Sequence, residues 1–305
     1  MSASNPIAPG VAPDPASSHG STGAAAGETA AMLSRNALAQ HLQRSDLDLE
    51  VIVSTASTNA DLIARARIGA PPRAVLRAAM RQTAGRGRDN RAWHGSDTGS
   101  LLFSLALSWR SDPAASAAVT LAGGLAIAQC LHAHGVDVQL KWPNDVLLGG
   151  RKLAGILTQM ADDPRGARTL VIGMGLNLVL DPAQRLAIEQ PVAELAECFG
   201  REALLAAREL WLARFAAAMI DAARRFDECG FAALRPRYNA WLAFLGQQVI
   251  LQATDQAPLS GIVRGVDDQG RLLLECEDGL RALISGEMSL RAVPLGEDGG
   301  RRQLP

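Results

Sequence analysis

Short apolar runs that alternate with helical patterns limit most strongly how this chain can fold. The strand-like runs lie at residues 51–53, 74–80, 101–107, 136–142, 146–148, 153–160 and 170–178, and the longer helical patterns at 30–42, 114–134 and 201–226. Strands of this length separated by helices predict an α/β domain of the α+β type. We therefore expect a mixed central sheet with flanking helices.

Local signals place several boundaries of these elements. A helix carrying Leu62 and Ile63 on one face is expected after the first strand, with Thr58 or Asn59 as its cap. Gly135 is placed to end the helix over 114–134. The pair Gly149-Gly150 between two apolar runs predicts a β-hairpin.

The sequence pattern changes from mixed helices and strands to short strands alone after residue 246. Five short apolar runs alternate with turn sequences, which is typical of a small antiparallel barrel. The first 28 residues are rich in Ala, Gly, Ser and Pro and predict a disordered tail. The predicted domains are thus 1–28, 29–245 and 246–297.

Composition excludes several classes of function. The formal net charge is −1 over 305 residues, so no global field attracts nucleic acid or an anionic membrane. No apolar run is long enough to span a bilayer, and the four cysteines are scattered as in reduced proteins. We expect a cytoplasmic protein without DNA or membrane partners.

Lysine is used very sparingly. Of the 30 basic residues only Lys141 and Lys152 are lysines. Because arginine serves wherever a positive charge suffices, these two positions indicate sites that need a compact ammonium.

The loop after the second strand concentrates arginine and glycine. Residues 81–93 include Arg86, Gly87, Arg88 and Trp93, a set that can bind an anion and stack on a base. A solvated arginine loop around a core tryptophan fits the composition equally well. A dinucleotide-binding fingerprint does not fit, because Asn90 occupies the third glycine position and a strand follows.

Four further segments carry polar or glycine residues at element ends. Residues 141–145 read Lys-Trp-Pro-Asn-Asp at a strand end, and residues 151–157 place Lys152 and Gly155 in a strand. Residues 173–177 contain two glycines, expected where a ligand approaches the backbone, and end in Asn177. Residues 57–59 read Ser-Thr-Asn. When each segment is taken singly, it can be explained as a plain turn, a solvated hairpin end or a simple helix cap.

Taken together and in this order, these segments resemble the biotin–protein ligases. The resemblance is close over residues 51–177, and the β segment from residue 247 is similar to the small SH3-like domain of that family. It implies a class II synthetase-like catalytic domain. It also implies an enzyme that forms biotinyl-5'-AMP from biotin and ATP and passes biotin to a lysine of an acceptor, such as the biotin carboxyl carrier subunit of acetyl-CoA carboxylase.

The resemblance further implies roles for individual residues. The biotin-binding set would be Ser57, Thr58, Asn59, Gln82, Arg86, Gly87, Arg88, Lys152 and Gly155. The ATP-binding set would be Arg91, Trp93, Lys141, Asn144, Asp145 and Asn177. Arg88 and Lys152 would be the catalytic residues, neutralising the reacting carboxylate and phosphate together with Mg²⁺. We expect no metal held by the protein alone, because His132 and His134 lie two apart and share no helical face.

The loop departs from the family pattern at one point. Where the family commonly continues Arg-Gly-Arg-Arg-Gly, this chain reads Arg88-Asp89-Asn90-Arg91. The Asp lowers the positive charge and the Asn restricts the backbone, although Asn still tolerates a positive φ.

Two alternatives share parts of this pattern. Lipoate–protein ligases have the same fold and chemistry, but the Gly-Arg-Gly-Arg loop and residues 141–145 favour biotin. A biotin-responsive DNA-binding repressor needs an extra module, whereas fewer than fifty residues precede the first strand and the first 28 lack Lys and Arg. The pattern leaves the possibility of a homo-oligomer open.

Overall fold

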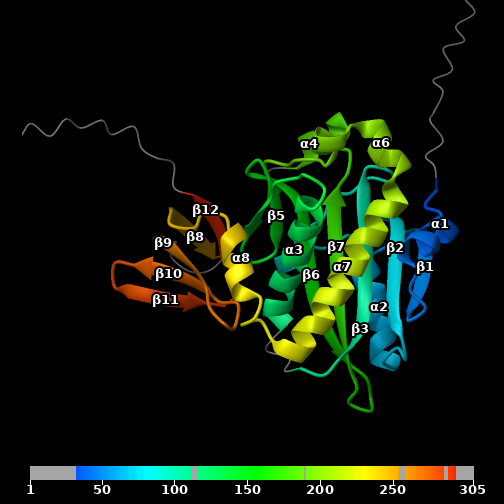
Figure 1. Cartoon of the computed structure of the whole chain (residues 1–305), viewed down its shortest axis with the longest axis horizontal. Helices are drawn as coiled ribbons and strands as arrows, with labels where there is room; N and C mark the ends of the chain where they lie inside the picture. The colour runs from blue at the N-terminus through cyan, green and yellow to red at the C-terminus, as the bar shows by residue number, and fades with distance from the viewer. Residues whose placement is uncertain (1–31, 112–115, 189, 254–257, 285–287, 293–305) are drawn as a thin grey trace, which may run out of the picture. The chain divides into compact units, whose positions relative to one another are not determined.

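A seven-stranded mixed sheet organises the first part of the chain (Figure 1). The computed structural model describes residues 32–111, 116–188, 190–253, 258–284 and 288–292, so the predicted tail 1–28 lies outside the described residues. The strands are β1 (Leu47–Thr55), β2 (Ala74–Gln82), β3 (Ser100–Trp109), β4 (Gln139–Lys141), β5 (Asp145–Leu148), β6 (Arg151–Asp162) and β7 (Arg168–Asn177). Their order is β1-β2-β3-β7-β6-β5-β4, with β1 parallel to β2 and all other neighbours antiparallel. The predicted mixed sheet is confirmed.

Helices cover both faces of this sheet. They are α1 (Arg35–Leu42), α2 (Thr58–Ile68), α3 (Ser116–His132), α4 (Pro182–Ala187), α5 (Ala196–Phe199), α6 (Arg201–Ala206), α7 (Arg208–Cys229) and α8 (Arg235–Trp241). Figure 1 shows α3 and α7 crossing one face. Leu105 of β3 belongs to the large core under these helices, whereas its neighbour Ala106 packs with Leu62 of α2 in a second cluster. Successive strand side chains point to opposite faces, so both faces are apolar.

Several boundaries differ from the prediction. Ser57, and not Thr58 or Asn59, caps α2 by accepting a hydrogen bond from the Ala60 amide. The helix predicted over 201–226 is broken into α6 and α7, because Ala207 has φ −105° and ψ 18°. The strand predicted over 136–142 shortens to β4.

The C-terminal part forms a separate five-stranded antiparallel sheet. Its strands are β8 (Gln248–Ala253), β9 (Leu259–Val266), β10 (Leu272–Cys276), β11 (Gly279–Leu283) and β12 (Met288–Ala292), in the order β11-β10-β9-β8-β12. This confirms the small all-β segment. Within the part of the chain that the structure describes, no helix is both long and apolar enough to cross a membrane.

Candidate active site

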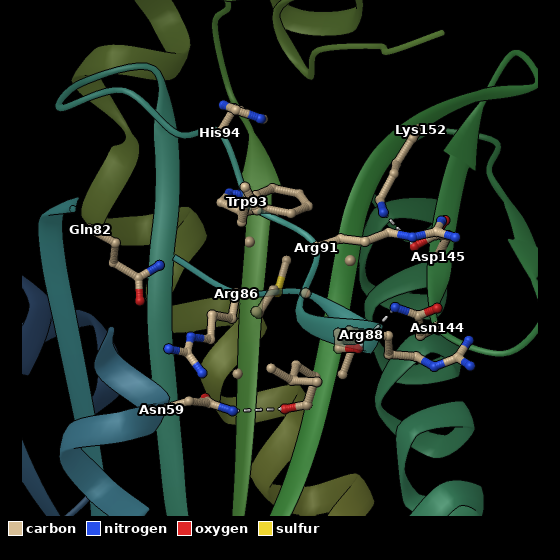
Figure 2. Close-up of a pocket in the computed structure, with 18 of the residues that line it drawn as sticks. Asn59, Gln82, Arg86, Arg88, Arg91, Trp93, His94, Asn144, Asp145 and Lys152 are labelled. Atoms are coloured by element: carbon tan, nitrogen blue, oxygen red, sulfur yellow. Dashed lines mark hydrogen bonds and ion pairs between the residues drawn. The ribbon is translucent and has the colours of Figure 1, made fainter. Parts of the chain in front are cut away.

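One cavity of about 740 Å³ brings together every residue that the sequence proposed for binding or catalysis. All fifteen line it: Ser57, Thr58, Asn59, Gln82, Arg86, Gly87, Arg88, Arg91, Trp93, Lys141, Asn144, Asp145, Lys152, Gly155 and Asn177. Figure 2 shows Asn59 and Gln82 on one side and Arg88, Asn144, Asp145 and Lys152 on the other, with Trp93 and Arg86 between them. The cavity therefore has an uncharged polar side and a charged side.

The polar side is built at the start of α2. Because Ser57 caps the helix, the side chains of Thr58 and Asn59 are free to face inward, where both are buried. The backbone amide of Thr58 donates to Gln82 Oε1 at 2.7 Å. Asn59 Nδ2 donates to the Leu157 carbonyl at 3.2 Å, which holds its amide in one orientation.

Sequence reasoning missed one residue of this side, Ser104 of β3. Its side chain is completely buried, and its Oγ lies 2.6 Å from Thr58 Oγ1 and 2.5 Å from Asn59 Oδ1. A hydroxyl inside the apolar run 101–107 was the available signal, since a buried polar group needs a partner.

The arginine loop closes on itself through its backbone. The Trp93 amide donates to the Gly85 carbonyl at 2.9 Å, and the Gly87 amide donates to the Arg91 carbonyl at 2.8 Å. A single turn of 3₁₀ helix over residues 88–90 forms the tip. The positive φ of the tip, 53°, falls on Asp89, a residue type that tolerates this conformation.

Arg88 is a desolvated cation at this tip. Its Nη2 atom is buried, forms a long ion pair of 3.9 Å with Asp89 Oδ2, and donates no hydrogen bond among the described residues. Burial lowers the pKa of Arg88, an effect that the carboxylates of Asp89 and Asp145 partly offset. Since a guanidinium stays protonated in proteins, its unused donor favours an anionic ligand.

Both lysines of the chain line the cavity. Lys152 Nζ pairs with Asp145 Oδ1 at 2.8 Å and lies 5.5 Å from the centre of the Trp93 ring. The side-chain Nδ2 of Asn144 donates to the Ile156 carbonyl at 3.3 Å, which ties residues 141–145 to β6.

The glycines of β6 and β7 serve neighbouring side chains of the protein itself. A Cβ at Gly175 would lie 2.3 Å from Trp93 Cε2, and one at Gly155 would lie 3.2 Å from the same ring. At Gly173 a Cβ would lie 2.2 Å from Asn59 Oδ1. Trp93 and Asn59 therefore lie directly against these glycines, all three of which line the cavity, and the approach of a ligand to them stays a prediction.

Asn177 holds the backbone around Lys152. Its Nδ2 donates to the Lys152 carbonyl at 3.4 Å and to the Ala193 carbonyl at 3.1 Å. This keeps the connection after α4 beside β6, so that Ile188 and Val192 also line the cavity. Neither residue was predicted, because only the folded chain brings this connection to the site.

Comparisons with known proteins agree with the site. Residues 51–177 match the Biotin/lipoate A/B protein ligase family, and residues 244–291 match the Biotin protein ligase C terminal domain. The structure of the biotin protein ligase from Aquifex aeolicus in complex with biotin and ATP is similar with a TM-score of 0.64 and 25% identity, covering 81% of this chain and 99% of that chain.

Curated relatives are similar over most of their length. The bifunctional ligase/repressor BirA of Salmonella typhimurium is 33% identical over 83% of this chain and 77% of its own length. The biotin–[acetyl-CoA-carboxylase] ligase of Mycobacterium tuberculosis is 34% identical over 74% of this chain and 83% of its own length. The biotin–[acetyl-CoA-carboxylase] ligase of Paracoccus denitrificans is 32% identical over 78% of this chain and 98% of its own length. The chain therefore belongs to the biotin/lipoate protein ligase family and is a biotin protein ligase.

Proposed function

We propose that this chain catalyses two steps in the single cavity: formation of biotinyl-5'-AMP and transfer of biotin to an acceptor lysine. The observation that carries the proposal is the buried, unused donor of Arg88 next to the Lys152–Asp145 pair. Desolvated cations bind and orient anions strongly. Both reactants of the first step, a carboxylate and a triphosphate, are anionic.

In the first step the biotin carboxylate attacks the α-phosphorus of ATP and pyrophosphate leaves. Arg88 and Lys152 would neutralise the two anions, which otherwise repel each other. Trp93 would stack on the adenine, and Lys141, Asn144, Asp145, Asn177 and Arg91 would surround the nucleotide. Asp89 and Asp145 line the cavity, but Asp145 is engaged by Lys152, so the ATP phosphates would supply most ligands for Mg²⁺.

In the second step the acceptor lysine attacks the carbonyl carbon of biotinyl-5'-AMP and AMP leaves. The proposed acceptor is the biotin carboxyl carrier domain of a carboxylase. We also propose that the enzyme works in the cytoplasm, which its four free cysteines support. A ligase without repressor activity remains our prediction, which a gel-shift assay with and without biotin tests.

The experiment that tests the function is pyrophosphate release. The purified chain is mixed with ATP, Mg²⁺ and either biotin or lipoate. We expect a burst with biotin, followed by steady turnover only when a carboxyl carrier domain is added. Release with lipoate at equal efficiency would contradict the biotin assignment, and no release with either acid would contradict the activity.

A further inference from the structure

The polar side of the cavity contains a chain of four oxygen atoms. Gln82 Oε1 lies 3.1 Å from Thr58 Oγ1, which lies 2.6 Å from Ser104 Oγ, which lies 2.5 Å from Asn59 Oδ1. Each of these three contacts is short enough for a hydrogen bond and needs one proton.

Both ends of this chain can only accept. Gln82 Oε1 already receives the backbone N–H of Thr58 at 2.7 Å, which identifies the atom as the oxygen of the amide. Asn59 Nδ2 donates to the Leu157 carbonyl, an obligate acceptor, so Asn59 Oδ1 is the atom that faces Ser104. The three contacts therefore share only the two hydroxyl protons of Thr58 and Ser104.

The two shortest contacts take these protons. Ser104 donates to Asn59 Oδ1 at 2.5 Å. The single proton of Thr58 Oγ1 can be donated either to Gln82 Oε1 at 3.1 Å or to Ser104 Oγ at 2.6 Å, and on distance we assign it to Ser104 Oγ. Thr58 Oγ1 and Gln82 Oε1 are then two acceptors 3.1 Å apart without a proton between them, and both residues line the cavity. Such a pair is unfavourable until a donor from outside joins it.

We propose that Ser104 is a positioning residue that selects the ligand: it draws the Thr58 proton away from the cavity, so that Thr58 and Gln82 present a paired acceptor. The ligand group that fits is an N–H donor such as the ureido group of biotin. A dithiolane ring, as in lipoate, has no donor and leaves the pair unmatched. The inference rests on the proposed function and deepens it.

Ser104→Ala removes the acceptor of the Thr58 proton. The Thr58 hydroxyl then turns to Gln82 Oε1, and the cavity loses half of its paired acceptor. We expect the KM for biotin to rise on the order of tenfold, with kcat within about threefold and the KM for ATP unchanged. Ser104→Thr, which keeps the hydroxyl, should restore the KM for biotin.

Ser100→Ala is the matched control. Ser100 is also a buried serine of β3, but its hydroxyl accepts from the Ser96 amide away from the cavity. We expect this variant to bind biotin as the parent does. Thermal unfolding of each variant checks that the fold is kept. If Ser104→Ala does not fold, Ser104→Cys replaces it, because a thiol sulfur is a much weaker acceptor for the Thr58 proton.

A second ligand separates hydrogen bonding from shape. In the cyclic carbonate analogue of biotin, oxygen replaces both ureido N–H groups without added bulk. The parent should bind this analogue at least tenfold more weakly than biotin, and Ser104→Ala should bind it no worse than the parent does. Dethiobiotin, which keeps both N–H groups, should show the full effect of the substitution.

The outcomes are distinguishable. If the parent releases no pyrophosphate with biotin, the proposed function fails. If the parent is active but Ser104→Ala keeps the parent's KM for biotin, or weakens biotin and the carbonate equally, the inference about Ser104 is overturned while the function stands.

Discussion

Arg88 and Lys152 are both cations, but the structure places them in different surroundings. Arg88 is largely buried with an unused donor, and Lys152 is paired with Asp145. A donor without a hydrogen-bond partner favours binding a ligand. The ammonium of Lys152, in contrast, can shift its interaction from Asp145 to a phosphate whose negative charge grows in the transition state. The two residues are therefore expected to fail in different ways when substituted.

Lys152→Arg is expected to slow adenylation although the charge is kept. The ammonium lies 2.8 Å from Asp145 Oδ1 and 5.5 Å from the centre of the Trp93 ring. A planar guanidinium is bulkier and cannot reproduce a compact point charge at this position. Lys152→Ala should be slower still, by about a hundredfold or more. Single-turnover formation of biotinyl-5'-AMP measures both, with Arg151→Lys as a control because Arg151 pairs with Glu197 outside the cavity. Normal rates would remove Lys152 from catalysis.

Arg88→Gly is expected to release the adenylate early. Losing a charge-assisted pair costs about 1.5–3 kcal/mol, or roughly tenfold to a hundredfold in affinity, most of it in the off-rate. The variant should still make biotinyl-5'-AMP but label bystander lysines, which biotin incorporation into albumin measures. If the variant makes biotinyl-5'-AMP and labels albumin no more than the parent does, Arg88 does not retain the adenylate. Arg91 then becomes the candidate for the residue that retains it.

At the scale of elements, the paired glycines of β6 and β7 form the surface on which Trp93 rests. Gly155 and Gly175 lie opposite each other in the strand register. Gly175→Ala would bring a methyl group within 2.3 Å of the Trp93 ring and force it away. We expect the kcat/KM for ATP to fall about tenfold while the affinity for biotin changes less.

Gly123→Ala in α3 is the control for this substitution. The nearest atom to a Cβ there lies at 3.7 Å, an ordinary contact, and alanine favours a helix. Equal effects of the two substitutions on ATP would show that Trp93 is not the cause.

Arg77 links β2 to β1 and α2. It pairs with Glu50 at 2.6 Å and with Asp61 at 2.8 Å. Burial raises the pKa of Glu50, but hydrogen bonds from Arg65 and Arg77 outweigh it and lower the pKa overall. Because the pKa of Glu50 is lower in the folded chain than in the unfolded chain, its ionised form stabilises the fold. This contribution to the free energy of unfolding is fully present above the unfolded-state pKa of about 4.3, and it is lost as the pH falls through the folded-state pKa.

Arg77→Met should lower the free energy of unfolding by about 1–3 kcal/mol at pH 7. The variant should also lose less stability than the parent between pH 5 and about pH 3, because without Arg77 the folded-state pKa of Glu50 is lowered less. Urea unfolding at several pH values measures both. Arg281→Met, in an exposed pair with Asp278, should change little; a parallel pH response of Arg77→Met and the parent would contradict the argument.

At the scale of the whole molecule, Trp142 joins the catalytic sheet to the C-terminal sheet. It is buried, lines the cavity, and donates from Nε1 to the Gly270 carbonyl at 3.1 Å. A side chain shared by the site and the second sheet couples the stability of both.

Trp142→Phe keeps the ring but removes this hydrogen bond. We expect about 1–3 kcal/mol less stability and a higher KM for ATP, since the neighbouring Lys141 and Asn144 lose a support. Thermal unfolding and initial rates measure the two effects, with the half-buried Trp241→Phe as a control. Unchanged stability and KM would show that the Gly270 contact contributes nothing to either part.

The amino-acid sequence was enough to predict the mixed sheet and the antiparallel C-terminal segment, and the fifteen residues that it proposed for the site line one cavity. Strand periodicity and turn residues are local signals, and a hairpin or a helix end forms from neighbours in the chain. Taken singly, segments 57–59, 81–93, 141–145, 151–157 and 173–177 each have a plain structural explanation. Their joint resemblance, in this order, to the biotin–protein ligases is what predicted the site residues.

Which side-chain atoms meet in the cavity depends on the folded chain. The cap of α2 moved to Ser57, which turned Thr58 and Asn59 inward, and Ser104 from a different element completed their hydrogen bonds. Trp93 lies against Gly175, a contact that the sequence did not predict. The Ser104 contacts join residues 45 and 46 positions apart, and Trp93 and Gly175 are 82 positions apart (175 − 93). Local propensity carries no information about such distant pairings.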